Sequence, residues 1–201
     1  TGWEYGGIVG LTRHWARLSG LSFRQVSLDI DPCLGADSLA QAVLGALRPE
    51  TRVLLVSHVA TGTGAILPVE AIAREAQRRG VITLIDGAHA VGALSLQLSG
   101  LEADFYGGNF HKWFLGPEGT GFGWVHPRWA GRLEWKFGGW ASERPPAFYQ
   151  AFGAGDAEIC RRFFPGTIDH VPLLGLGETL RFWKKHQPEV LRSRQVALRD
   201  Y

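Results

Sequence analysis

The sequence of 201 residues contains no methionine, only two cysteines and no marked excess of either charge. Cys33 and Cys160 cannot build a disulfide framework and lack the spacing of metal ligands, which favours a reducing compartment, and we expect the cytoplasm. The 21 basic and 19 acidic residues give a formal net charge of +2. Because the basic residues are also scattered rather than clustered, the sequence argues against nucleic acid as a partner.

A long uninterrupted hydrophobic run is missing as well. The most hydrophobic stretch, residues 53–69, contains Ser57, His58 and several threonines and glycines, which excludes a membrane span. Charged residues among positions 1–20 exclude a secretory signal peptide. With 45% hydrophobic and 20% charged residues, the chain has the composition of a globular domain. The absence of an initiator methionine leads us to expect part of a longer polypeptide.

Hydrophobic periodicity predicts helices that alternate with short strands. The run 52–57 is aliphatic and β-branched, as expected of a strand that is covered on both faces, and 81–85 has the same character. A helix opened by Pro68 lies between them, and this strand–helix–strand order is typical of a parallel crossover, which predicts an α/β fold. The remaining predicted elements are helices at 8–20, 36–48, 172–186 and 189–201, strands at 23–28, 104–106 and 119–125, and irregular structure at 137–156.

Polar side chains follow three of the predicted strands. Ser57 and His58 follow the first, Asp86 to His89 follow the second, and Asn109 to Lys112 follow the third. In open α/β sheets, ligands bind beyond the carboxyl ends of the strands. We therefore expect a carboxylate, two or three imidazoles, an amide and a lysine to converge at one edge of the sheet.

This set of groups suits the chemistry of pyridoxal phosphate. A lysine amine in a partly desolvated pocket can attack an aldehyde. A carboxylate such as Asp86 is costly to bury unless it meets a cation, and a protonated pyridine nitrogen is one. Asp86, His89 and His111 could instead bind zinc or iron, but that alternative leaves Lys112 without a role.

Three motifs carry a family resemblance. DGAHAVG at 86–92, GNFHKW at 108–113 and GPEGTGFGWV at 116–125 resemble the class V aminotransferase group of fold-type I pyridoxal-phosphate enzymes. The separation of 26 residues between Asp86 and Lys112 also matches that group. EYGG at 4–7 is similar to the isopenicillin N epimerase-like branch, to which the cysteine desulfurases are related.

The resemblance implies a three-layer α/β fold with a mainly parallel sheet, the incomplete large domain of such an enzyme. Residues 1–186 would be the central and C-terminal part of the cofactor-binding domain. Residues 187–201 would begin the helix that leads to a small C-terminal domain. The family's upstream phosphate-binding loop and the arginine that binds the substrate carboxylate would lie outside the sequence.

The resemblance also implies roles for individual residues. Lys112 would form the Schiff base with the cofactor and later move the substrate's α-proton. The other implied cofactor contacts are Asp86 with the pyridinium nitrogen, His89 near the phenolic oxygen, Tyr5 stacked on the ring, Asn109 and His111 at the phosphate, Thr61 close to the cofactor, and Gly166 and Thr167 reaching the partner subunit's phosphate.

From these roles we expect a homodimeric pyridoxal 5'-phosphate enzyme that acts on an amino acid, as an epimerase or aminotransferase does. Two alternatives remain open. One is a C–S lyase or cysteine desulfurase, which shares the same first carbanion. The other is a truncated, non-catalytic relative that retains the core for dimerisation or binding.

Overall fold

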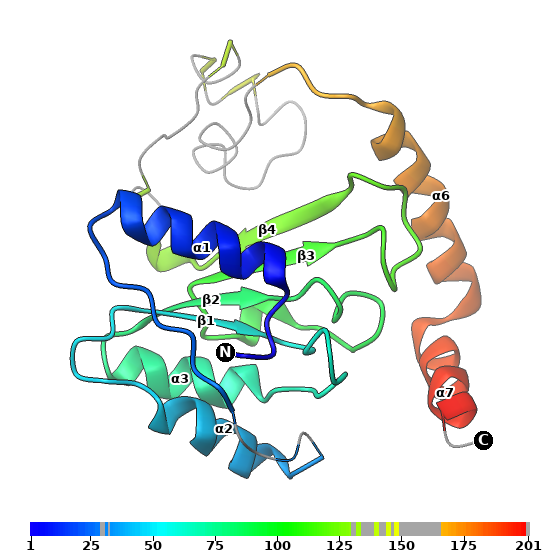
Figure 1. Cartoon of the computed structure of the whole chain (residues 1–201). Helices are drawn as coiled ribbons and strands as arrows, with labels where there is room; N and C mark the ends of the chain where they lie inside the picture. Colours follow the sequence, from blue (N-terminus) through cyan, green and yellow to red (C-terminus); the bar gives the residue numbers. More distant parts are fainter. Residues whose placement is uncertain are drawn as a thin grey trace.

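The computed structural model describes residues 1–28, 31, 33–129, 132–133, 139–140, 144–145, 147–148 and 166–199. Its centre is a four-stranded sheet in the order β1-β2-β3-β4, made of β1 (Val53–Ser57), β2 (Ile82–Asp86), β3 (Phe105–Asn109) and β4 (Gly121–Val125) (Figure 1). The first three strands are parallel, and β4 runs antiparallel to β3. The predicted α/β class with a mainly parallel sheet is therefore confirmed.

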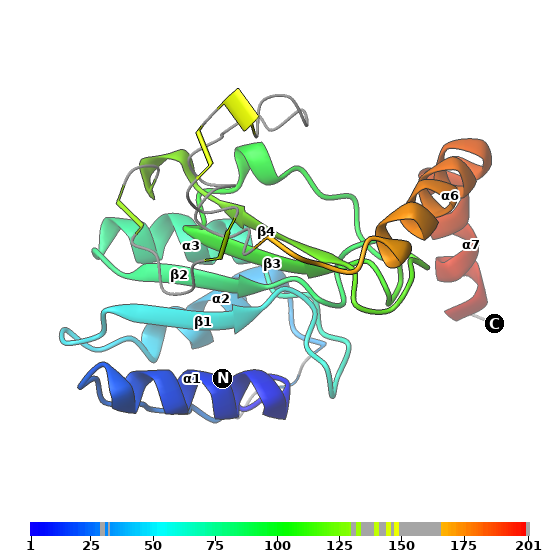
Figure 2. The ribbon, with the colours of Figure 1, turned by 90° about the horizontal axis from the view of Figure 1, so that it is seen from above.

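Helices cover both faces of this sheet. Helix α1 (Gly6–Leu18) lies on one face, and α2 (Ala36–Gly45) and α3 (Val69–Arg78) lie on the other (Figures 1 and 2). The described chain also has two 3₁₀ turns, η1 (Leu98–Gly100) and η2 (Pro127–Trp129), and two helices, α6 (Val171–His186) and α7 (Pro188–Arg199), which lie beyond the carboxyl ends of β1–β3 (Figure 1).

The hydrophobic core lies between the sheet and α3. Val56, Ile85 and Tyr106 from three strands pack there with Ile72 and Ala73 of α3, and all five are buried. On the opposite face the strand residues are only partly covered, and α1 contributes a single buried residue, Val9, of its own. The sheet therefore has one closed face and one face with open space beneath α1.

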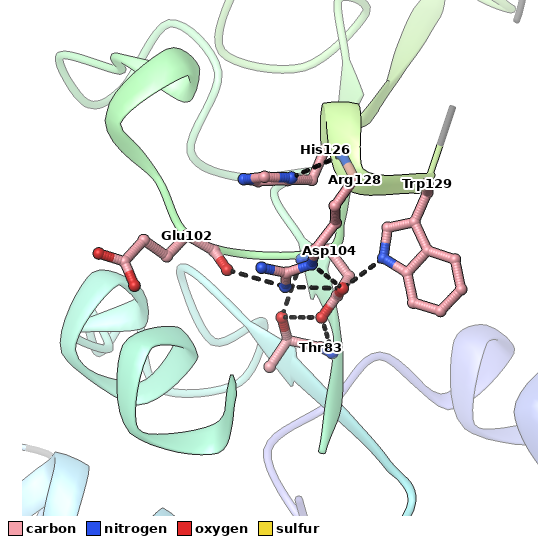
Figure 3. A network of polar contacts seen from close by, with 6 residues as sticks. All are labelled: Thr83, Glu102, Asp104, His126, Arg128 and Trp129. Carbon is pink, nitrogen blue, oxygen red and sulfur yellow. Dashed lines mark hydrogen bonds and ion pairs between the residues drawn. The ribbon is translucent and has the colours of Figure 1, made fainter. Parts of the chain in front are cut away.

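A polar network ties the amino ends of β2 and β3 together (Figure 3). The Asp104 carboxylate, 2% exposed, accepts hydrogen bonds from the Thr83 amide at 2.8 Å and from Trp129, and pairs with Arg128 at 2.7 Å. Burial opposes ionisation of Asp104, but these hydrogen bonds and the Arg128 charge outweigh it and lower its pKa. The network anchors the strands at the edge opposite the predicted site.

The predicted strand at 23–28 is wrong. This segment has no regular secondary structure, although Val26 accepts a hydrogen bond from the Gly2 amide and Leu28 reaches the core. An alternating pattern favours an extended chain, but a strand also needs a neighbouring strand, and within the described residues none pairs with this segment.

The C-terminal helices follow the prediction closely. The helix expected at 172–186 is α6, and a left-handed backbone at Gln187, with φ of 55°, separates it from α7. Most of the region predicted to be irregular, 137–156, lies outside the described residues. None of the helices in the described ranges combines the length and the apolar character that a membrane crossing needs.

Candidate functional site

A cavity of about 540 Å³ lies between α1 and the open face of the sheet. Asp86 at the end of β2 and Lys112 after β3 both line it. Pairing of Ser57 with Asp86 and of Asp86 with Gly107 brings three strand ends to one edge, as the sequence predicts. The structure also places Tyr5, Thr61 and Asn109 on this cavity.

The floor of the cavity is formed where Asp86 and Gly107 lie side by side. The Asp86 Oδ1 accepts a hydrogen bond of 2.9 Å from the Ala88 amide, which orients the carboxylate. A Cβ built at Gly107 would meet no atom within 4 Å, so the space above this position is open. The carboxylate therefore borders a space that a flat group could occupy.

Lys112 lies in the turn after β3, and its amine points toward two aromatic side chains. Its Nζ is 3.2 Å from Nε2 of His89 and 5.9 Å from the centre of the Tyr5 ring. The second ring nitrogen of His89, Nδ1, accepts a 3.2 Å hydrogen bond from the indole N–H of Trp113. Burial, followed by the positive charge of Lys112, lowers the pKa of His89, and the Asp86 charge opposes this effect.

Tyr5 is placed at the cavity by the buried residue before it. The Glu4 Oε2 accepts a hydrogen bond of 2.5 Å from the hydroxyl of Ser57, the last residue of β1. This contact fixes the start of α1 at the carboxyl edge of the sheet. The Tyr5 ring itself is 57% exposed, so it has no extensive packing against this chain.

The loop after β2 and the turn after β3 touch at Gly92. Its backbone has φ of 87°, and a Cβ there would lie 2.6 Å from the backbone of Trp113 and Phe114. A glycine is needed for both reasons. The last glycine of the DGAHAVG motif therefore lets the Lys112 turn approach the His89 loop.

Helix α6 holds the other side of the Lys112 turn. The Trp183 indole donates a 2.7 Å hydrogen bond to the Phe114 carbonyl, and the two rings stack at a centre-to-centre distance of 5.3 Å. The Thr179 hydroxyl donates to the Leu115 carbonyl at 3.3 Å. The turn that carries Lys112 is thus fixed from a helix almost seventy residues further along the chain.

His58 lies beneath Asp86, on the closed side of the sheet. Its Nδ1 shares a 2.9 Å hydrogen bond with the Tyr106 hydroxyl, and its amide donates to the Asp86 carbonyl at 2.8 Å. Burial lowers the pKa of His58 from 6.5 to about 4, and burial followed by the Asp86 charge raises that of Tyr106. Both side chains are therefore neutral at pH 7, and the His58 amide holds the Asp86 backbone.

Four of the predicted cofactor contacts, His89, His111, Gly166 and Thr167, are not among the residues that line this cavity. His89 reaches the site through its contact with Lys112. His111 is exposed and its Nδ1 lies 3.3 Å from the Thr120 carbonyl, to which it can only donate. Thr167 accepts a hydrogen bond from the Trp140 indole, and Gly166 packs closely on that same ring. Their predicted roles at the phosphate remain predictions.

Sequence reasoning did not single out Trp113, Trp183 or Gly92. Their contacts join segments that are far apart in the chain, and no periodic pattern reveals such pairs. The available signals were the position of Trp113 directly after the lysine and that of Gly92 at the end of the DGAHAVG motif.

The zinc or iron alternative receives no support from the geometry. Among the residues that the structure describes, no three histidine, cysteine or acidic side chains gather closely enough to hold a metal ion. Asp86, His89 and His111 therefore do not form the ligand set that this alternative requires.

Comparison with known proteins gives the same picture. The family model described as aminotransferase class-V matches residues 12–201. Isopenicillin N epimerase of Streptomyces clavuligerus is 39% identical over 191 residues, which are 92% of this chain and 48% of that enzyme. The kynureninase of Deinococcus radiodurans is 33% identical over 74% of this chain and 36% of its own length.

Solved structures with the same fold include the cystine C–S lyase C-DES in complex with cysteine persulfide. It is 29% identical, with a TM-score of 0.76, over 92% of this chain and 49% of the other. A lysine-to-alanine variant of C-DES, with glycine covalently linked to its pyridoxal-phosphate cofactor, gives a TM-score of 0.77. The chain spans about half the length of C-DES and of the Streptomyces enzyme. On the family match and these likenesses, the chain belongs to the aminotransferase class-V family.

Proposed function

We infer that the protein is a pyridoxal 5'-phosphate-dependent enzyme that acts on an amino acid or another amine-bearing substrate. The observation that carries this inference is the presence of one lysine and one carboxylate, Lys112 and Asp86, on the walls of a single cavity. They come from the two motifs that mark the family, and they reach the cavity from the ends of neighbouring parallel strands.

The residues of the cavity fit this cofactor. A volume of about 540 Å³ falls in the range of small-molecule sites, and the open position above Gly107 has room for a planar ring. Asp86 can accept a hydrogen bond from a protonated ring nitrogen, and Tyr5 offers an aromatic face at the entrance. Asn109 and Thr61 add an amide and a hydroxyl that can donate to phosphate oxygens.

When bound, the cofactor supplies an aldehyde and an electron-withdrawing pyridinium ring. Lys112 provides the amine for covalent attachment. Once a substrate amine has replaced it, the freed Nζ is the base that takes the proton from the substrate's α-carbon. Asp86 keeps the ring nitrogen protonated. The His58 amide holds the Asp86 carbonyl, and the neutral His58–Tyr106 pair lies on the side away from the cavity.

We propose an epimerase-like or aminotransferase-like outcome first. The similarity to isopenicillin N epimerase extends over most of this chain and supports that choice. An epimerase would deliver a proton to the opposite face of the substrate's α-carbon, whereas an aminotransferase would leave the amino group with the cofactor. Both begin with the same proton removal by Lys112.

C–S cleavage is the second candidate. The likeness to C-DES, at 29% identity over nearly all of this chain, favours it. A desulfurase would need a cysteine close to the reacting atoms, and Cys33 is exposed and does not line the cavity. Cys160 lies outside the described residues.

We also propose a homodimer in the cytoplasm. The exposed Thr167, beside Gly166 in a left-handed conformation with φ of 119°, is available to a second subunit. Sedimentation of the complete gene product tests the dimer, since a monomer at micromolar concentration would contradict it. Cell fractionation tests the location.

The function is tested with the complete gene product purified with and without added pyridoxal phosphate. We expect an absorption band near that of a protein-bound pyridoxal group, and loss of the α-hydrogen of an amino acid in deuterium oxide. Lys112→Ala should lose the α-hydrogen exchange and the lysine-linked form of the cofactor that borohydride fixes to the protein. Lys185→Ala, which changes an exposed lysine of α6, should retain both.

The outcomes separate the candidates. Inversion of the α-carbon supports an epimerase, transfer of the amino group to a keto acid supports an aminotransferase, and release of sulfide from cysteine or cystine supports a C–S lyase. A wild-type protein that takes up no cofactor would favour the non-catalytic alternative and would overturn the proposed function.

A further inference from the structure

His89 lies between two nitrogen groups, and this arrangement restricts where its hydrogen can be. Its Nδ1 is 3.2 Å from the indole nitrogen of Trp113, and its Nε2 is 3.2 Å from the amine of Lys112. An indole N–H can only donate a hydrogen bond. The Nδ1 of His89 must therefore be the acceptor and cannot carry a hydrogen.

A neutral imidazole has one N–H and one acceptor nitrogen. Burial, which is the larger cause and does not depend on the charge of Lys112, lowers the pKa of His89 and supports the neutral ring at pH 7. With Nδ1 occupied by Trp113, the hydrogen of His89 lies on Nε2, the nitrogen that faces Lys112. An N–H can donate to the lone pair of an unprotonated amine, whereas an ammonium group has only hydrogens to offer.

We propose that Trp113 is a positioning residue that fixes His89 as the Nε2–H tautomer, so that His89 donates its hydrogen to the unprotonated amine of Lys112. This inference rests on the proposed function, because an unprotonated amine is the form of lysine that attacks a carbonyl. If Trp113 lacked its N–H, Nδ1 could carry the hydrogen instead. Nε2 would then be free to accept from an ammonium group.

The position of the Trp113 indole is explained by its contact with His89 rather than by burial in the core. Half of the Trp113 side chain is exposed (50%), so packing in the core does not explain an indole at this position. Gly92 allows the backbone of Trp113 to approach the loop that carries His89. Trp183 holds the next residue, Phe114, through its carbonyl and its ring. The indole is thus directed at His89 from a turn fixed on both sides.

The test measures how readily Lys112 reacts in the cofactor-free protein. A trace amount of acetic anhydride labels unprotonated amines, and peptide mass spectrometry gives the acetylation of Lys112 relative to the exposed Lys185. Trp113→Phe keeps an aromatic ring and removes the N–H. Trp15→Phe, at an exposed tryptophan of α1, is the matched control.

We expect the ratio of Lys112 to Lys185 labelling near pH 8 to fall about fivefold in Trp113→Phe, the factor that follows from losing one net hydrogen bond. The ratio should stay at the wild-type value in Trp15→Phe. An unchanged ratio in Trp113→Phe, or an equal fall in both variants, would overturn the proposal.

A second measurement needs no variant of Trp113 and so does not depend on how that variant folds. Nitrogen NMR of ¹⁵N-histidine-labelled wild-type protein, with the His89 signals assigned by their loss in His89→Gln, reports which ring nitrogen carries hydrogen. We expect hydrogen on Nε2, and hydrogen on Nδ1 would refute the proposal.

Both measurements use protein without cofactor, so they separate this inference from the proposed function. If pyridoxal phosphate never attaches to Lys112 but the tautomer and the labelling behave as expected, the function is wrong and the arrangement stands. If the cofactor attaches and the tautomer is the other one, only the role of Trp113 is wrong.

Discussion

The half-buried neutral histidine beside the Asp86 backbone, His58, makes the stability of the protein depend on pH in a defined range. Burial lowers the pKa of His58 from 6.5 to about 4 in the folded state. Between these values the unfolded chain binds a proton at this site and the folded chain does not. The free energy of unfolding therefore falls as the pH drops from about 6.5 toward 4. Above that range His58 is neutral in both states and does not lower it.

The size of the effect follows from the two pKa values. At about 1.4 kcal/mol for each tenfold change in proton affinity, the full difference corresponds to about 3 kcal/mol. About 2.5 kcal/mol of this should be lost between pH 7.5 and 4.5. Such a loss is a large part of the stability of a typical domain.

Urea unfolding of wild type and His58→Gln at a series of pH values measures this term, because contributions from all other groups cancel in the difference. His14→Gln, at an exposed histidine of α1, is the control and should follow the wild type. The gap between wild type and His58→Gln should narrow by about 2.5 kcal/mol on acidification from pH 7.5 to 4.5. Parallel curves for the two proteins would refute a neutral His58 in the folded state.

Three further substitutions test the framework of the site. Gly92→Ala forces a Cβ against the Trp113 backbone at a positive φ. We expect the free energy of unfolding to fall by about 2–3 kcal/mol in thermal unfolding and the uptake of pyridoxal phosphate to weaken. A fully stable variant would contradict this packing. Trp183→Phe keeps the ring stacking but removes one hydrogen bond, and should lower the free energy of unfolding in urea by about 1 kcal/mol. An unchanged stability would show that the bond contributes nothing. Asp104→Asn breaks a buried charge pair and should lower the free energy of unfolding by about 3 kcal/mol. Its control, Glu102→Gln at an exposed carboxylate, should change stability by less than about 1 kcal/mol. Equal effects of the two variants would argue against the network.

Much of the fold could be predicted because its signals are local. The aliphatic runs that form β1 and β2, and the proline that precedes α3, follow directly from residue type and spacing. The segment 23–28 was predicted wrongly because a strand is defined by its partner, and a local pattern does not say whether a partner exists.

The site was predictable to the extent that strand ends share an edge. Asp86 and Lys112 reach the same cavity because β2 and β3 are parallel neighbours. The direction of a side chain within a turn does not follow from that rule, and His111 accordingly points to Thr120. The contact of His89 with Trp113 depends on how two loops meet, which the spacing along the chain does not encode.

The central claim is that Lys112 is the residue to which pyridoxal phosphate attaches, and borohydride reduction followed by peptide mass spectrometry tests it most directly. Reduction of the cofactor-loaded complete gene product makes the attachment permanent. We predict a single phosphopyridoxyl group on the peptide that contains Lys112, and none on the peptide with Lys184 and Lys185. Attachment to any other lysine, or a protein that carries no such group after reduction, would contradict the claim.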